Sequence, residues 1–230
     1  MNNLATQIIE NGITYSISKT DVTVKKLINK NMQYIIIPDN IQGKQVTKIG
    51  RKAFANSNIE QIQFPSNIDM IGDAAFQDCA NLVEVWQYGR NQNTVIAISR
   101  EVFKNCSNLE KIVFKREMLI LGFEPFYGCK SLKYLPTIIS VSVFGPNAFK
   151  DCISLEEIKI KGPHEFKVEQ DAFLNCNNLN KICLRCKVDL SDYLKSVLKN
   201  MEIKAYYKAE NILNLAYEGY SVTMLPYMSF

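Results

Sequence analysis

The sequence predicts an α/β repeat solenoid, because one short phrase recurs six times along the chain. In five copies the phrase is a Phe, usually preceded by Ala or Val, then Cys three residues later, Leu six residues later and an aliphatic residue nine residues later; the first copy has Ser57 in place of Cys and is one residue shorter. The Phe residues stand at positions 54, 76, 103, 126, 149 and 173, so the gaps are 22, 27, 23, 23 and 24 residues. A period in the low twenties indicates one supersecondary unit per copy, stacked so that each unit covers its neighbour's apolar face.

The end of each copy has the alternation of a half-buried strand. Residues 155–160 read Leu-Glu-Glu-Ile-Lys-Ile, and residues 109–114 and 179–184 repeat the spacing. Apolar residues at every second position are typical of a strand with one face in the core. The Leu-x-x-Leu-x-Leu spacing is the leucine-rich-repeat signature. We therefore expect a leucine-rich-repeat right-handed superhelix with short parallel strands on its concave face.

A run near the start carries a closer resemblance. The segment Ile35-Ile36-Ile37-Pro38 and the residues that follow it up to Ala53-Phe54 resemble the BspA-like leucine-rich-repeat family. The similarity covers about residues 13–187, and its six successive copies make it specific. The resemblance implies a surface or secreted recognition protein, since members of that family are known mainly as such proteins of bacteria and protists.

The ends of a solenoid need caps, because terminal rungs otherwise expose apolar core. Residues 1–31 are expected to form an N-terminal capping hairpin, in which 13–18 pairs with 22–27. Residues 32–187 hold the leucine-rich repeats, beginning with a degenerate strand at 32–37. Residues 188–230 form a C-terminal cap: a helix over 193–199 after the Ser191-Asp192 start, a last rung at 198–203, a short helix over 211–217 and a tail. We expect the tail to pack on the last rung, with a partner contact as the alternative.

Composition and charge favour no particular ligand. Hydrophobic residues make up 47% and charged residues 22% of the chain, and the formal net charge is +4. That charge is too weak to indicate nucleic acid, and no apolar run has the length of a membrane-spanning helix. Residues 1–12 lack the basic start and apolar stretch of a secretory leader. They predict a cytoplasmic protein; the alternative is a secreted or cell-surface protein whose leader has been removed.

The seven cysteines predict an interior ladder and not a reactive site. Five of them hold the same place in successive copies, where a free thiol fills a buried site as a small apolar group: Cys79, Cys106, Cys129, Cys152 and Cys176. Cys183 and Cys186 form a Cys-x-x-Cys without the second pair that a zinc site would need. These two are expected to be the thiols that react in the native protein. The sequence indicates no metal, no cofactor and no catalytic site for its single histidine, His164.

The strand residues that point away from the core are the candidate binding surface. Counting eight, ten and twelve residues from each Phe, one fewer in the first copy, also places Gln61, Gln63, Pro136, Ile138 and Cys183 on this face. The predicted binding residues are Glu84, Trp86, Tyr88, Lys111, Val113, Lys115, Tyr134, Glu157, Lys159, Lys161, Lys181 and Arg185. Aromatic residues and Arg are the side chains that dominate interface energetics.

Two alternative interpretations weaken the prediction that these residues form a binding surface. Gln87 stands where an apolar residue is expected, in the copy with the longest gap, and a one-residue register slip there would turn Trp86 into the core. Lys on an exposed strand also serves simply as a solvated residue that discourages edge pairing. The remaining possibilities are binding through the opposite side, a loop or an end, and the absence of an identifiable site.

The sequence thus predicts a non-catalytic ligand-recognition module that binds a macromolecular partner, most simply a protein, through the concave face. A binder of an anionic polymer, polysaccharide or nucleic acid, is the first alternative, and it would use Lys111, Lys115, Lys159, Lys161, Lys181 and Arg185. A thiol-dependent enzyme using Cys183 or Cys186 is the second. No cofactor and no membrane insertion are expected, and the oligomeric state is left open.

Overall fold

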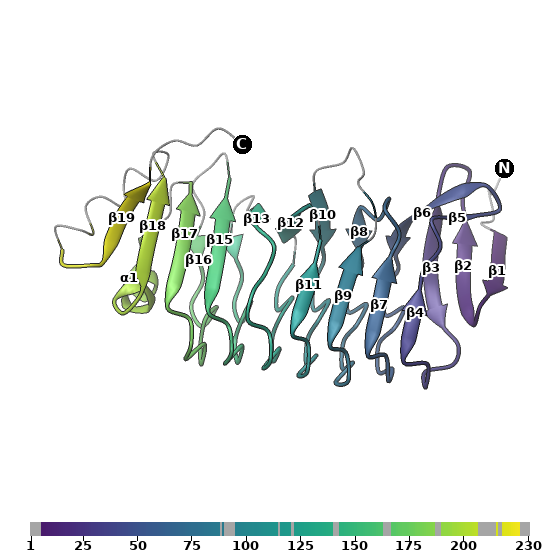
Figure 1. Ribbon diagram of the computed structural model, residues 1–230, viewed down its shortest axis with the longest axis horizontal. Helices are drawn as coiled ribbons and strands as arrows, with labels where there is room; N and C mark the ends of the chain where they lie inside the picture. Colours follow the sequence, from purple (N-terminus) through teal and green to yellow (C-terminus); the bar gives the residue numbers. More distant parts are fainter. Residues whose placement is uncertain are drawn as a thin grey trace.

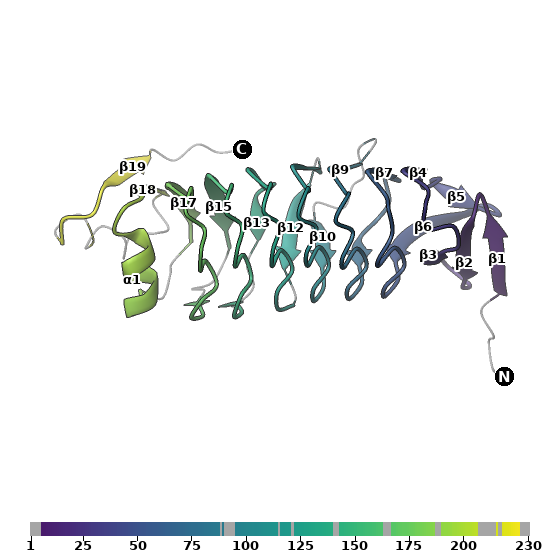
Figure 2. The same cartoon turned by 90° about the horizontal axis from the view of Figure 1, so that it is seen from below.

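The chain forms an elongated stack of short strands, with β1 (Thr6–Glu10) at one end of the stack and β19 (Val222–Leu225) at the other (Figure 1). The computed structural model describes residues 6–87, 89, 95–114, 116–120, 122–139, 143–162, 167–186, 190–206, 215 and 218–225. Seen from below, the strands stand in two rows along a nearly straight axis (Figure 2). The right-handed sense and the concave curvature of the superhelix stay predictions.

The front row consists of the strands that end each repeated phrase. Four of them pair in parallel as one sheet: β4 (Tyr34–Ile36), β7 (Gln61–Phe64), β9 (Glu84–Gln87) and β11 (Lys111–Val113). Towards the C-terminus the row continues with β15 (Glu157–Lys161), β17 (Lys181–Arg185), β18 (Glu202–Tyr206) and β19 (Val222–Leu225). Between β11 and β15 the segment that contains Pro136 forms no strand, because proline has no N–H to donate to the ladder.

The back row consists of the strands that precede each Phe. Its members are β6 (Lys44–Ile49), β8 (Met70–Ile71), β10 (Val95–Ile98), β12 (Glu117–Ile120), β14 (Val143–Phe144) and β16 (Lys167–Val168). The short strand β13 (Ile138–Ile139) pairs with β12 on one side and β15 on the other. One thirteen-stranded sheet therefore passes from the back row of the N-terminal half to the front row of the C-terminal half.

The six anchoring phenylalanines form a continuous stack along the core. Their ring centroids are 5.1 to 5.7 Å apart and neighbouring ring planes differ by 6 to 13°. Each Phe is at most 5% exposed. Offset-stacked rings gain stabilisation beyond the area they bury, so this stack sets the register of the copies.

Two left-handed backbone positions flank each Phe, two residues before and two residues after it. At the first Phe they are Lys52 (φ 53°) and Asn56 (φ 56°), and at Phe103 they are Glu101 (φ 56°) and Asn105 (φ 60°). Asn, Asp and Gly tolerate this region best, and one of these three occupies the later position in all six copies. The side chains also link copies, since Asn105 Nδ2 donates to Asp78 Oδ1 at 2.8 Å.

At the N-terminus three antiparallel strands extend the back row. The strand β2 (Ile13–Ile17) pairs with β3 (Val22–Leu27), as the alternation of residues 13–27 predicts. The structure adds a strand that the sequence analysis missed, β1 (Thr6–Glu10), which pairs with β2 across the turn Asn11-Gly12. An Asn-Gly pair between β-forming residues was the available signal for it. A short strand, β5 (Asn40–Ile41), folds back on β6.

At the C-terminus a short helix, α1 (Asp192–Leu198), precedes the last rungs. It begins where predicted, because the Ser191 side chain accepts a hydrogen bond from the backbone N–H of Leu194 at 3.3 Å. The described part of the tail adds a strand, β19, to β18 in parallel. The helix expected over 211–217 lies outside the described residues except for Leu215, which is buried. The boundaries 1–31, 32–187 and 188–230 stay a proposal.

The expected α/β class is not confirmed. Within the described residues the repeats carry strands and turns, and α1 is the one helix that spans a full turn. In each copy a short strand and turns stand between the front strand and the next Phe, where an α/β repeat would have a helix. No helix in the described parts of the chain is long and apolar enough to cross a membrane.

Candidate front-face binding site

The front row presents two parallel lines of side chains at its N-terminal half. One line follows the register Tyr34, Gln61, Glu84 and Lys111 across β4, β7, β9 and β11. The other follows Ile36, Gln63, Trp86 and Val113. The residues between them on each strand point into the core, because side chains alternate along a strand.

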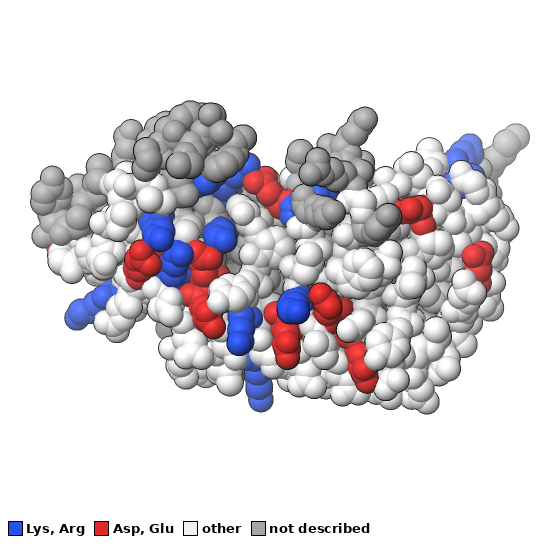
Figure 3. Space-filling model, in the orientation of Figure 1, with Lys and Arg blue, Asp and Glu red and all other residues white. Residues whose placement is uncertain are grey.

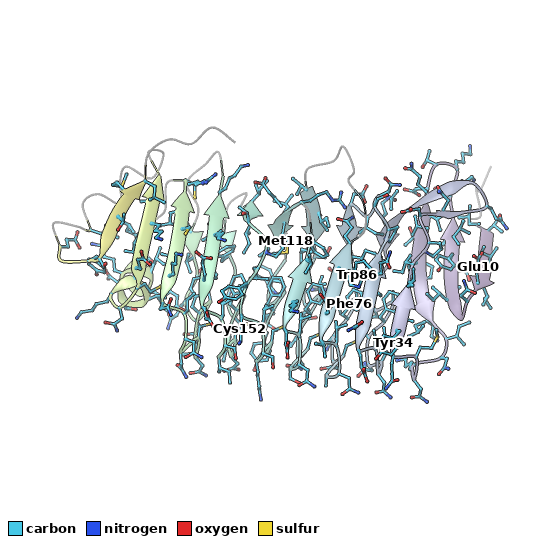
Figure 4. All side chains as sticks on the ribbon, in the orientation of Figure 1. Glu10, Tyr34, Phe76, Trp86, Met118 and Cys152 are labelled. Atoms are coloured by element: carbon cyan, nitrogen blue, oxygen red, sulfur yellow. The ribbon has the colours of Figure 1, made fainter. Side chains whose placement is uncertain are left out.

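Trp86 lies on this face in the predicted register. Its neighbours on β9, Val85 and Gln87, are 0% and 4% exposed, whereas Trp86 itself is half-buried. Figure 4 places Trp86 on the front strand β9 and Tyr34 on the front strand β4. The register slip that would have turned Trp86 inward has therefore not occurred.

A buried polar network explains how Gln87 is accommodated at an apolar position. Its side-chain Nε2 donates to the carbonyl oxygens of Pro65 at 3.0 Å and Ser66 at 3.1 Å. Its Oε1 accepts from Arg116 Nε at 3.2 Å, and Arg116 also donates to the carbonyl of Ile68. A buried amide is tolerated when its donors and acceptor are paired, so the network holds the end of β9 in place.

Apolar side chains near Trp86 are strongly exposed. Tyr34 is 62%, Ile36 68% and Val113 46% exposed. We name as the front patch the uncharged residues Tyr34, Ile36, Gln61, Gln63, Trp86 and Val113. The sequence analysis missed Tyr34 and Ile36, although the alternation of buried Ile35 and Ile37 with these two was the signal.

The C-terminal half of the front face carries interleaved charges. Glu157 pairs with Lys159 at 3.1 Å and with Lys181 at 2.9 Å, and these partners lower the pKa of the half-buried Glu157 against the effect of its burial. Lys161 pairs with Glu117 at 2.7 Å. Figure 3 shows acidic and basic side chains mixed over this half, and a mostly uncharged surface over β4 and β7.

The strand β18 extends this charged zone with residues that the repeat count did not reach. Glu202 lies beside Lys181, and Lys204 beside Cys183. Lys204 also pairs with Glu202 on its own strand at 3.4 Å. The row Glu157, Lys181 and Glu202 therefore alternates in sign, whereas the next row places Lys159 and Lys204 on either side of the neutral Cys183.

The middle of the face is less regular than the sequence predicts. Tyr134 is 55% exposed, and its hydroxyl donates to Glu156, which raises the pKa of Tyr134. Ile138, which counting places on the face, is fully buried because it pairs with Ile160 one position out of the expected register. Ile138 follows Phe126 by twelve residues, whereas its partner Ile160 follows Phe149 by eleven, so the fourth copy contains one more residue before the pair.

Some predicted residues lie outside the described residues: Tyr88, Lys115 and His164. The other predicted binding residues occupy the front row, as residues of β9, β11, β15 and β17 or, for Tyr134, in the segment between β11 and β15. Trp86 and Val113 are adjacent, whereas Lys159, Lys161, Lys181 and Arg185 form a separate group on β15 and β17.

The five ladder cysteines are free thiols, of which four are buried and Cys176 is half-buried. Each ladder thiol donates to the backbone carbonyl of the Phe in the preceding copy at 2.9 to 3.1 Å, as between Cys106 and Phe76. Burial raises the pKa of the Cys106 thiol well above its ordinary value. Cys152, labelled in Figure 4, is one of them.

Cys183 and Cys186 do not have the environment of activated thiols. Cys186 is only 2% exposed, and burial raises its pKa to about 12. Cys183 is half-buried, and both burial and the neighbouring Glu157 raise its pKa. The sequence allowed at most Cys183 and Cys186 to react in the native protein; the burial of Cys186 in the core favours Cys183 alone of these two. No group of three or more His, Cys, Asp or Glu side chains in the described part of the chain has the arrangement of a metal site.

Comparison with known proteins gives a consistent result. The leucine rich cell surface protein of Faecalibacterium prausnitzii is 20% identical, with a TM-score of 0.61 over 96% of this chain and 54% of its own. A leucine-rich repeat protein from Bacteroides ovatus is 23% identical, with a TM-score of 0.57 over 96% of this chain and 53% of its own. This chain thus spans about half the length of these two relatives, and the likeness shows a shared fold.

The curated proteins include no match to this chain. The model of the BspA type leucine rich repeat region matches in six copies, over residues 28–96 and 96–221. The match covers most of the chain, and its copies agree with the stack of phenylalanines and strands described above. The chain belongs to the BspA-type leucine-rich repeat family.

Proposed function

We propose that this chain is a non-catalytic recognition module that binds a protein partner through its front face, centred on the front patch. One observation carries the proposal: the half-buried Trp86 lies on the front side of a regular strand, with the exposed Val113 beside it on β11 and Gln63, followed by the exposed Ile36, on the other side. Leucine-rich repeat families commonly act in binding, and repeat solenoids offer extended binding surfaces.

The energetics favour the front patch as the centre of such an interface. A large aromatic side chain on a fixed strand loses little conformational entropy on binding, and Trp and Tyr are enriched among hot-spot residues. The patch is uncharged, and the paired charges of β15, β17 and β18 lie to one side of it. An uncharged centre with a charged rim is the usual anatomy of a protein interface.

The front face is also large enough for a specific complex. Eight strands and the segment that contains Pro136 follow one another along it, and strands are spaced about 4.8 Å apart. The row is therefore about 40 Å long, which suits an interface of about 800 Å² per partner.

The two other candidate functions have less support. An anionic polymer would need basic side chains with little competition, whereas Lys159, Lys161 and Lys181 each pair with a carboxylate of the same chain. A thiol-dependent enzyme would need a lowered thiol pKa, and the pKa values of Cys183 and Cys186 are both raised.

The compartment is a proposal as well. We propose the cell surface or the extracellular space, with the cytoplasm as the alternative. The Faecalibacterium prausnitzii relative is described as a cell surface protein, and this description motivates the choice. Labelling of intact source cells with an antibody to this chain tests it: signal only after permeabilisation would favour the cytoplasm.

The test of the function is a binding comparison between Trp86→Ala and a matched control. Proteins that the wild-type chain captures from the source cell are identified, and each is purified and titrated against the variants. Trp86→Ala is expected to weaken binding by about 2 kcal/mol or more at a nearly unchanged melting temperature. The control, Ile153→Ala, removes an apolar side chain that is 42% exposed in a turn outside the front row, and its binding should be unchanged.

The fluorescence of Trp86 provides a second readout that needs no partner. It is the only Trp in the chain, so its emission reports this site alone. The exposed part of the half-buried indole should be accessible to iodide, and a bound partner should protect it. Emission that iodide does not quench, or binding that Trp86→Ala leaves intact, contradicts the proposal.

A further inference from the structure

At its N-terminal end the thirteen-stranded sheet has an edge strand, β1, with one side unpaired among the described residues. β1 is the last strand of the sheet and pairs only with β2 among the described residues. Figure 1 shows β1 at the far end of the stack. Four of its five residues are exposed, and Ile9 is 67% exposed.

The turn between β1 and β2 determines which backbone groups of β1 point outward. Asn11 (φ 48°) and Gly12 (φ 74°) both have left-handed backbone, which is the requirement of a two-residue type I′ turn. The residues that flank such a turn, Glu10 and Ile13, form a hydrogen-bonded pair. Hydrogen-bonded and non-bonded pairs alternate along antiparallel strands. The N–H and C=O groups of Gln7 and Ile9 therefore point away from β2.

β1 lacks the features that prevent an edge strand from pairing with another chain. In natural proteins these features are Pro, Lys, a β-bulge or a very short strand. β1 reads Thr-Gln-Ile-Ile-Glu, and all five of its residues pair with β2 without a register shift. The next pairing of the sheet, between β2 and β3, does contain a shift at Thr14 and Tyr15.

We propose that β1 pairs antiparallel with β1 of a second copy of this chain, about a two-fold axis at Ile8. In this register Gln7 faces Ile9 of the second copy, so the outward groups of both residues form four hydrogen bonds between the copies. A register centred on Ile9 would need Asn11 as a strand residue, and Asn11 has a left-handed φ in the turn. The pairing centred on Ile8 is therefore the one that uses the whole described edge.

The side chains are compatible with this register. The two Ile8 residues meet as a non-hydrogen-bonded pair, in which side chains approach most closely. Glu10 faces the Thr6 hydroxyl of the second copy, so that two carboxylates do not oppose each other. The occupant is a second copy because the edge is self-complementary, as an isologous interface requires.

The dimer would carry two binding faces. A two-fold axis between antiparallel strands is perpendicular to their sheet, so the two sheets continue each other and both front faces point the same way. Two linked copies of a site raise the avidity for a partner that is itself repeated on a surface. The dimer does not depend on the proposed function, and its test uses the chain alone.

Sedimentation equilibrium over a roughly hundredfold range of concentration tests the dimer. The wild-type chain should pass from monomer to dimer. Ile9→Pro removes two symmetry-related hydrogen bonds of the interface and keeps the N–H groups that pair with β2, so it should raise the dissociation constant about tenfold or more. Ile9→Val keeps the N–H and should dimerise like the wild type. Unchanged melting temperatures show that the variants are folded.

Cross-linking provides an independent readout of the register. Under mild oxidation Ile8→Cys should form a covalent dimer, because the two introduced thiols face each other across the axis. Ile9→Cys faces Gln7 of the second copy and should cross-link far less. A chain that stays monomeric at every concentration overturns the proposal. So does a dimer that Ile9→Pro leaves intact, and so do fibres that grow by pairing of β1 with β19.

Discussion

At the scale of the residue, the ladder position shows why a thiol suits the interior of this solenoid. The site accepts a small side chain that is buried and can still donate to the Phe carbonyl of the preceding copy. Free Cys meets both needs, as a small hydrophobe with a weak S–H donor. In the first copy Ser57 takes the place, and its hydroxyl lies 3.3 Å from the Cys79 thiol. The repeated cysteine is therefore explained by packing and hydrogen bonding, without redox chemistry.

The reactivity of the thiols follows from the same burial. Native protein should react with a thiol reagent mainly at Cys183 and more slowly at Cys176, since these two are half-buried and the other five are buried. All seven should react after denaturation. Mass spectrometry of the labelled peptides identifies the sites. Fast labelling of Cys106, Cys129 or Cys152 under native conditions would contradict the ladder.

At the scale of the element, each copy is held by its stacked Phe and by the turns that flank it. Phe149 is fully buried, with its ring centroid 5.5 Å from that of Phe126 and 5.4 Å from that of Phe173. Lys159 lies on the adjacent strand β15, where half of its side chain is exposed. The same copy thus contains a core position and a surface position that a single experiment can compare.

Truncation should separate these two positions clearly. Phe149→Ala is expected to cost about 3–5 kcal/mol of unfolding free energy, because it removes a buried ring and leaves a cavity between two others. Lys159→Ala removes only an exposed ion pair and should change stability by less than about 0.5 kcal/mol. Denaturant unfolding measures both. Similar losses in the two variants would mean that the repeat register is wrong.

The connection between β2 and β3 contributes a pH-dependent interaction. Asp21 accepts hydrogen bonds from Ser18 Oγ at 2.6 Å and Lys48 Nζ at 2.9 Å, and these lower the pKa of its carboxyl. A lowered folded-state pKa stabilises the fold above the unfolded value of about 3.9, and the contribution is lost as the pH falls through the folded-state pKa.

Asp21→Asn should therefore be less stable than the wild type at neutral pH, by about 1 kcal/mol or less because the pair is partly exposed. The difference should shrink when both proteins are measured at a pH of about 3 or below. Denaturation midpoints at the two pH values check this. A difference that is equal at both would show that the effect of Asp21→Asn does not come from its charge.

At the scale of the whole molecule, the two halves of the front face differ in charge. The N-terminal half contains the uncharged front patch, and the C-terminal half contains the paired charges of β15, β17 and β18 (Figure 3). Glu84 and Lys111 lie side by side on β9 and β11, next to the front patch. A partner that covers both halves would place its apolar residues on one and its charged residues on the other.

The salt dependence of binding distinguishes a protein partner from an anionic polymer. Partner binding centred on Trp86 should weaken only slightly as the salt concentration rises, because the front patch carries no charge. Binding of a polyanion through Lys159, Lys161 and Lys181 should fall steeply with salt, as counterions are released. Titrations with the purified partner at low and high salt give the slope. A steep slope together with an unaffected Trp86→Ala would favour the polymer.

The sequence was sufficient to predict a solenoid of stacked repeats with parallel strands, although not its α/β class, because each copy repeats the same local sequence pattern. The spacing of Phe, Cys and Leu predicted the stacked core, and the alternation around Trp86 predicted the strand that exposes it. Ser191 likewise predicted the N-terminal cap of α1. These features depend on contacts within one copy or between identical neighbours, so that a single sequence contains the evidence for them.

Only the tertiary structure decided where the pattern breaks and what lies beside what. Gln87 stays in register because Arg116, 29 residues later, meets it in the core, and no local pattern predicts that contact. Pairing between distant strands likewise turned Ile138 inward and set Glu157 between two lysines. Local spacing determines which side chains leave the core, whereas the pairing of separate strands determines their neighbours. The character of the binding face was therefore set by the assembled stack.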